Sequence, residues 1–96
     1  MPIAVLTLEL RIEGAQSLKD KRQVVRSLKD KLRQRFNVSV AELEETNLWQ
    51  RATIGVVSIS GSRDYLSGLI EQVERAASRI ANENGAELTD SYVDLE

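Results

Sequence analysis

The chain has 96 residues, of which 42% are hydrophobic and 29% charged, with a formal net charge of −2. This length fits one small domain with a single hydrophobic core. The chain has no cysteine and no histidine, which excludes disulfides, thiolate metal sites and a Ser–His–Asp triad. It also has no glycine-rich GxxxxGK[ST] or GxGxxG loop for a nucleotide. We therefore expect a protein that is not an enzyme and that needs no metal or cofactor.

No apolar stretch of about 18 residues is present, so the sequence predicts no membrane-spanning helix. The apolar residues near the N-terminus alternate with polar ones and lack the basic flank and cleavage site of a signal peptide. We expect a cytoplasmic protein with no membrane partner.

Ile3 to Glu13 alternates as a strand with one buried face. Ser17 then precedes an amphipathic segment from Leu18 to Arg35, and Asp20 completes a weak form of the capping box. The expected core positions are Ala4, Leu6, Leu8, Leu10 and Ile12 in the strand and Leu18, Val24, Val25, Leu28, Leu32 and Phe36 in or just after the helix.

Two further strands are predicted from Asn37 to Glu44 and from Ala52 to Ser60, joined by a connection of hairpin length. Gly55, inside the second of them, indicates a bulge or a close approach. Trp49, the only tryptophan, lies in the connection. We expect it to fold back over the sheet edge or to lie in a subunit interface, with stacking on a nucleic-acid base as the alternative.

Ser62 is expected to begin a second helix that stops at Asn84-Gly85, and Glu87 to Leu95 forms a last strand. The apolar face of this helix consists of Leu66, Leu69, Ile70, Val73, Ala77 and Ile80. The order strand, helix, strand, strand, helix, strand predicts one α+β domain with a ferredoxin-like βαββαβ fold. In that fold two helices cover one face of a four-stranded antiparallel sheet. The other face is partly apolar here, which favours a homodimer.

The basic residues are concentrated in the first predicted helix. Eight of the thirteen Lys and Arg residues lie between Lys19 and Arg35, against Asp20 and Asp30, so this segment carries +6 and the remainder −8. On a helical wheel, five of the eight fall within about 80° of one another, beside the apolar arc, and extend about 20 Å along the axis. We call this row, which consists of Lys19, Arg22, Arg26, Lys29 and Arg33, the basic stripe.

The basic stripe does not stabilise the helix that carries it. Its neighbours three and four residues apart are like-charged, and each such pair costs about 0.2 to 0.5 kcal/mol. Only Asp30 lies within reach of Arg26 and Arg33. The charge is therefore balanced either by an anionic partner or by acidic groups of the same or a neighbouring subunit. The candidate acidic groups are Glu42, Glu44 and Glu45.

We expect the basic stripe to contact the phosphates of structured RNA, with Lys21 and Arg51 as secondary contacts. The stripe lacks the amide and aromatic groups that read bases, and the central strands lack the aromatic residues of an RNA recognition motif. Two other functions remain open. One is a homo-oligomeric interaction module that binds an acidic protein surface, and the other is a small-ligand regulatory domain of the ACT kind.

Three segments, Ser17 to Arg22, Phe36 to Glu42 and Leu48 to Thr53, resemble successive blocks of the uncharacterised bacterial YlxP-like family. The resemblance covers essentially the whole chain. It implies a small ferredoxin-like protein of unassigned biochemical function, typically encoded beside translation initiation and ribosome-maturation factors. That neighbourhood favours ribosomal RNA or a ribosome-associated protein as the partner. The family defines no catalytic residues, so the resemblance adds none here.

Overall fold

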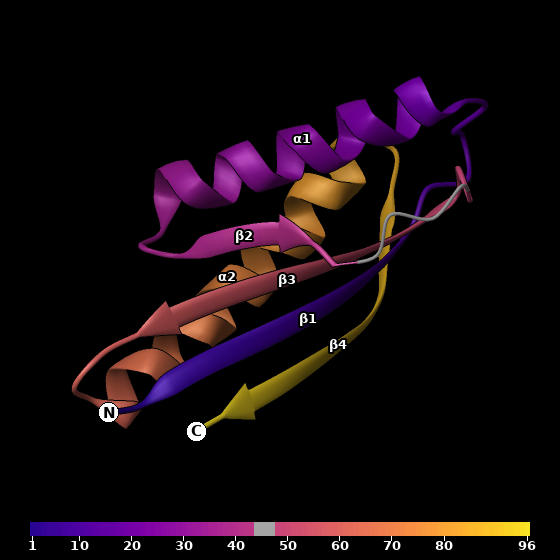
Figure 1. The fold of residues 1–96 in the computed structure, drawn as a ribbon. Coiled ribbons are helices and arrows are strands. Elements are labelled where there is room, and N and C mark those ends of the chain that lie inside the picture. Colours follow the sequence, from indigo (N-terminus) through magenta and orange to yellow (C-terminus); the bar gives the residue numbers. More distant parts are fainter. Residues whose placement is uncertain (44–47) are drawn as a thin grey trace.

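The computed structural model describes residues 1–43 and 48–96 and has the predicted ferredoxin-like order of elements (Figure 1). These elements are β1 (Ile3–Arg11), α1 (Leu18–Arg35), β2 (Ser39–Glu42), β3 (Arg51–Ile59), α2 (Arg63–Glu83) and β4 (Glu87–Leu95). The four strands form one antiparallel sheet in the order β2-β3-β1-β4. Both helices pack on the same face, so α1 lies beside the short edge strand β2 and α2 lies toward β4.

The helix ends follow the signals in the sequence. The Ser17 hydroxyl accepts a hydrogen bond from the Asp20 amide at 3.1 Å, and the Asp20 carboxylate accepts one from the Gln16 amide at 2.9 Å. Ser62 caps α2 in the same way. Gly85 follows α2 with a φ of 74°, a left-handed conformation that glycine adopts without steric cost.

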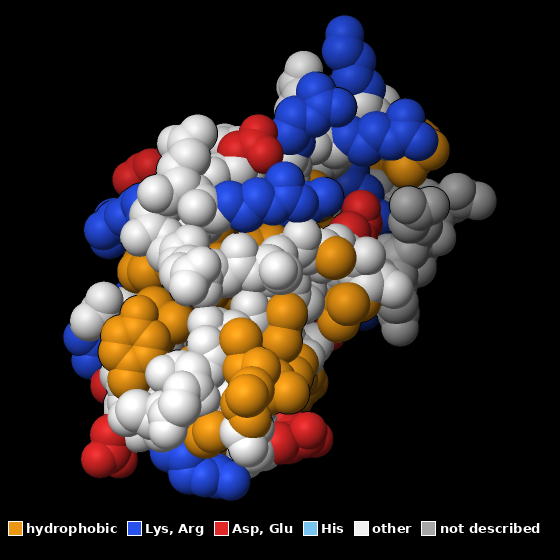
Figure 2. All heavy atoms as spheres, turned by 60° about the vertical axis from the view of Figure 1, so that its left-hand side comes forward, with side chains coloured by type: hydrophobic (Ala, Val, Ile, Leu, Met, Phe, Trp, Pro, Cys, Tyr) orange, Lys and Arg blue, Asp and Glu red, His pale blue; other side chains and the backbone are white. Residues whose placement is uncertain are grey.

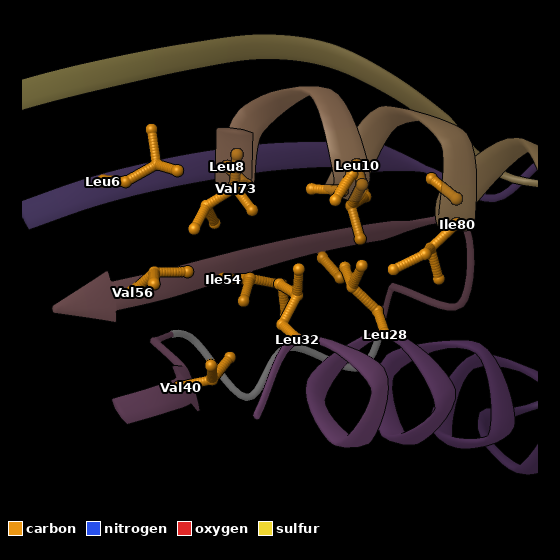
Figure 3. Packing of buried hydrophobic residues seen from close by; sticks show 14 of the residues in the cluster. Leu6, Leu8, Leu10, Leu28, Leu32, Val40, Ile54, Val56, Val73 and Ile80 are labelled. Atoms are coloured by element: carbon orange, nitrogen blue, oxygen red, sulfur yellow. The ribbon is translucent and has the colours of Figure 1, made fainter. Parts of the chain in front are cut away.

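Alternate residues of the central strands fill one core with the apolar faces of both helices. Every predicted core position in β1 and in α2 is buried, as are Val25, Leu28 and Leu32 of α1. Figure 3 shows side chains from both helices meeting those of β1 and β3 in this core. Val24 and Phe36 pack against its margin. The hydrophobic period therefore predicts correctly which side of α1 faces the sheet.

Both ends of β4 and the start of β1 match the prediction, and the other described strand ends differ from it by one or two residues. β1 stops at Arg11, although the amide of Ile12 still donates to the carbonyl of Gln50 at 2.8 Å, in register with the pairing of β1 and β3, and Ile12 remains buried. β2 is shorter than predicted at its start, and position 44, the predicted end, lies outside the described residues.

Gly55 marks a close approach rather than a bulge. β3 pairs with β1 in unbroken register, and the irregularity of the sheet lies between Glu9 and Leu10, where β1 pairs with β4. A Cβ atom on Gly55 would lie 2.7 Å from the Cδ2 atom of Leu43. The missing side chain therefore lets Leu43 lie against the face of the sheet that the helices leave open.

Within the described part of the chain, neither helix combines the length and the hydrophobicity that crossing a membrane requires.

Candidate nucleic-acid interface

The basic stripe lies on the flank of α1 that faces β2. The helix buries Val25, Leu28 and Leu32 against the sheet, which turns the stripe toward solvent beside the sheet edge. Four of its five residues are exposed, and Lys29 is half-buried. Lys and Arg side chains accordingly gather in the upper part of the face shown in Figure 2, above a group of apolar side chains.

A groove of about 370 Å³ separates the stripe from β2. Its charged lining consists of the cations Arg22, Arg26, Lys29 and Arg33 and the carboxylates Asp30 and Glu42. The tertiary structure thus brings four of the five stripe residues to one concave surface, whereas Lys19 is exposed near the start of the helix. We call this feature the basic groove.

Arg33 binds the edge strand β2. Its guanidinium donates a hydrogen bond to the carbonyl of Val40 at 3.0 Å and lies 3.7 Å from Asp30 Oδ1. An edge strand exposes backbone groups that have no strand partner, and Arg33 satisfies one of them. Arg33 also forms the ion pair with Asp30, so this carboxylate is paired with Arg33 rather than with Arg26.

Lys21 is a correction to the set of phosphate contacts predicted from the sequence. Only 3% of its surface is exposed, and its Nζ atom lies 3.4 Å from Glu42 Oε2, which is also buried. A buried ammonium needs a counter-charge, because desolvation alone would penalise it strongly. Lys21 therefore holds β2 to α1 and is not a surface cation.

The ion pair of Lys21 with Glu42 affects the net charge of the basic groove. Glu42 is the acidic group expected to offset the stripe, but its charge is matched by Lys21, and positions 44 and 45, the other two, lie outside the described residues. Among the residues that the structure describes, Lys19, Arg22, Arg26 and Lys29 form no ion pair. The groove therefore carries a net positive charge.

The remaining cations of α1 point elsewhere. Lys31 lies 4.0 Å from Glu83 of α2, and the guanidinium of Arg35 lies 5.6 Å from the centre of the Phe36 ring. Neither residue lines the basic groove.

Arg51 and Trp49 do not line the basic groove. β3 starts at the end of the molecule where α1 begins (Figure 1). Arg51 is exposed at the start of β3, opposite Arg11 of β1. Trp49 keeps 48% of its surface exposed, so the fold itself does not cover it. The expectation that Trp49 folds back over the sheet is thus not met within the single chain.

The opposite edge of the sheet is acidic. β4 carries Glu87, Asp90 and Asp94 and no basic residue. Asp90 accepts a hydrogen bond from the phenol of Tyr92, and together with its negative charge this raises the pKa of Tyr92. Among the described residues no three carboxylates gather into a group that could hold a metal ion. Charge is therefore separated across the sheet, positive at the α1 and β2 edge and negative at β4.

The sequence matches the family described as "Protein of unknown function (DUF503)" over residues 3–93. It is 38% identical over 55 residues to "Uncharacterized protein YlxP" of Bacillus subtilis (strain 168), a match that covers 57% of this chain and 60% of that protein.

Solved structures share the fold at low sequence identity. A structure of Arabidopsis thaliana MSL1 is 18% identical with a TM-score of 0.61, covering 93% of this chain and 34% of that one. A de novo designed protein with a ferredoxin fold is 6% identical with a TM-score of 0.56, covering 100% and 83%. A C-terminal segment of the alpha subunit of aIF2 from Pyrococcus abyssi is 13% identical with a TM-score of 0.53, covering 97% and 50%. At these identities the likeness concerns the fold alone.

The match over residues 3–93, together with the YlxP relative, shows that this chain belongs to the DUF503 family.

Proposed function

We propose that this protein is a cytoplasmic, non-enzymatic binding protein that docks its basic groove on the phosphates of structured RNA. Ribosomal RNA is the class that the sequence resemblance favours. One observation carries the proposal: Arg22, Arg26 and Lys29 line one groove and have no ion-pair partner among the described residues. The two carboxylates of that groove, Asp30 and Glu42, are already paired with Arg33 and Lys21.

The energetics of α1 support an external anion. The stripe residues repel one another along the helix, at about 0.2 to 0.5 kcal/mol for each close pair. A phosphate backbone removes this repulsion and releases its own condensed counterions, which favours binding at low salt. Arg33 and Arg51 are secondary contacts in this proposal, because Arg33 is already engaged by β2 and Arg51 lies outside the groove.

The shape of the charge favours a polymer over a small ligand. From Arg22 to Lys29 the cations extend about 10 Å along the helix axis at 1.5 Å per residue. A row of that length exceeds the reach of one small anion but follows a run of phosphates. The groove itself presents no aromatic or amide side chain among its described lining residues. Phosphate geometry, rather than base sequence, is therefore what this surface recognises.

Binding of purified protein to ribosomal RNA across a salt series tests the proposal. We expect binding near 50 mM salt, and we expect Arg22→Glu, Arg26→Glu and Lys29→Glu together to abolish it. Any binding that the triple variant retains below 50 mM salt should show a slope of log affinity against log salt that is smaller by about two to three. The matched control reverses three exposed arginines of α2, Arg63, Arg75 and Arg79, and should keep wild-type affinity. Equal affinity of the two triple variants, or no binding by the wild type, would contradict the proposal.

A second observation supports assembly of the protein with itself. On the open sheet face, Ile3 lies opposite Ile59 and Val5 opposite Val57, and Ile59 remains 53% exposed. This apolar cluster stays open to solvent at Val57 and Ile59, which no described residue covers. We propose that a second copy of the chain covers it, because a two-fold axis lets one apolar patch meet its own copy.

A further inference from the structure

We infer that Trp49 is a stacking platform for an unpaired RNA base, separate from the basic groove and next to the chain segment that leads into α1. The inference rests on the proposed RNA-binding function and adds a second element of recognition to it. It begins with the exposure of the side chain: Trp49 is 48% exposed and its neighbour Leu48 60% exposed. A large aromatic ring left open to water is typical of a contact site.

The surroundings of Trp49 form a concave surface. A hollow of about 380 Å³ is lined, among the described residues, by Leu48, Trp49, Gln50 and Arg51. It combines apolar surface from the first two residues with a guanidinium from the last. This combination suits a nucleotide, because its base can stack on the indole ring while its phosphate contacts the guanidinium.

The chain on the C-terminal side of Trp49 is anchored. The carbonyl of Gln50 accepts a hydrogen bond from the amide of Ile12 at 2.8 Å, and its side-chain Nε2 donates to the carbonyl of Glu13 at 3.3 Å. Both partners belong to the connection that leads from β1 into α1. The segment that holds Trp49 is thereby tied to the connection that leads into α1, where the basic stripe begins. Figure 1 shows that β3 starts at the end of the molecule where α1 begins.

The charges at this end favour a nucleic acid over an apolar protein partner. Arg51 and Arg11 lie directly opposite each other on β3 and β1, a like-charged pair that destabilises a sheet. Arg11 is paired with Glu13 at 2.6 Å, whereas Arg51 forms no ion pair among the described residues. An apolar partner on Trp49 would leave the positive charges of Arg51 and of the basic stripe without a counter-charge. A polyanion that passes from the stripe to Arg51 balances both and brings a base to the ring.

The geometry selects RNA with an unpaired nucleotide. A base inside a duplex presents only its edge, because both of its faces are stacked on neighbouring bases. An indole ring can therefore receive only a base from a loop, bulge or single-stranded end. The protein should prefer a helix flanked by unpaired nucleotides over a fully paired helix with the same number of phosphates.

The test uses the fact that Trp49 is the only tryptophan, so its fluorescence reports on this site alone. An RNA duplex with a short unpaired tail is compared with a blunt, fully paired duplex that has the same number of phosphates. We expect the tailed RNA to quench Trp49 emission and to bind more tightly. Trp49→Ala should weaken binding of the tailed RNA by about fivefold to 100-fold and leave binding of the blunt duplex unaffected, while Trp49→Phe keeps most of the difference.

The outcomes separate this inference from the proposed function. If both RNAs bind, the triple charge reversal on α1 abolishes binding, and yet Trp49 emission and the affinity of Trp49→Ala are unchanged, the stacking platform is overturned and the phosphate-docking proposal stands. If neither RNA binds at low salt, both fail. Because the quenching is measured on the wild-type protein, the conclusion does not depend on the folding of a variant.

Discussion

At the scale of single residues, the most consequential contact joins Lys21 to Glu42. Lys21 falls within the apolar arc of α1, where only a paired charge is tolerated. Its ammonium matches the carboxylate of Glu42 at 3.4 Å, and the side chains of the two residues are only 4% and 20% exposed. This buried pair therefore holds α1 against β2 and also balances the charge of Glu42, a carboxylate that lines the basic groove.

Lys21→Met should destabilise the protein by about 2 kcal/mol, because it leaves the buried Glu42 carboxylate without its ammonium partner. The double variant Lys21→Met with Glu42→Leu should recover most of that loss, since two apolar side chains replace the pair without leaving a charge behind. Urea denaturation of the two single variants and the double variant measures the coupling. Additive losses in the double variant would show that the pair does not act as a unit.

At the scale of elements, α1 combines two conflicting demands. Its apolar face follows the helical period and fills the core, while its cations repel one another and oppose the positive end of the helix dipole in the first turns. The end of the helix is therefore supported by Ser17 and Asp20, whose side chains accept hydrogen bonds from backbone amides of the first turn and of the connection before it.

Ser17→Ala should destabilise the protein by about 1 kcal/mol, the usual effect of losing a capping hydroxyl. Ser27→Ala is the matched control, because it makes the same chemical change within α1 and favours the helix slightly. Urea denaturation of both variants provides the comparison. If Ser17→Ala proved as stable as Ser27→Ala, the cap would contribute nothing to the fold.

At the scale of the whole molecule, cations, carboxylates and exposed apolar side chains are each concentrated along different elements. Cations concentrate at the α1 and β2 edge, carboxylates follow β4, and the apolar cluster of Ile3, Val5, Val57 and Ile59 occupies the open face of the sheet. A copy of the chain on the open face would leave the basic groove accessible, because the groove lies between α1 and β2 on the helical side.

Sedimentation equilibrium should show a dimer of the wild-type protein, and Ile59→Glu should convert it to a monomer by placing a charge in the apolar contact. Val93→Glu is the matched control, because Val93 is exposed to a similar extent, 55% against 53%, and lies outside the cluster. It should sediment as the wild type does. A monomeric wild-type protein, or an Ile59→Glu variant that remains dimeric, would contradict the proposed cover of the sheet.

The fold was predictable because its signals are local. The period of two in β1, the helical period in α1 and α2, the serines at positions 17 and 62 and the turn at Gly85 all act within a few residues, and each is confirmed. The basic stripe follows from the same local geometry, since the helix fixes which side chains share a flank. The strand ends were less predictable, because they depend on partners from distant segments, as at Ile12 and Gln50.

The sequence by itself therefore determined the elements, their buried faces and the row of cations on α1. Only the tertiary structure decided which of those cations are available. It buries Lys21 against Glu42, engages Arg33 with Val40, and leaves Arg22, Arg26 and Lys29 lining a groove. The physical reason is that the helical period gives only the angular position of each side chain around its own helix. Whether a charge is paired depends on which strand edge the fold places beside that helix.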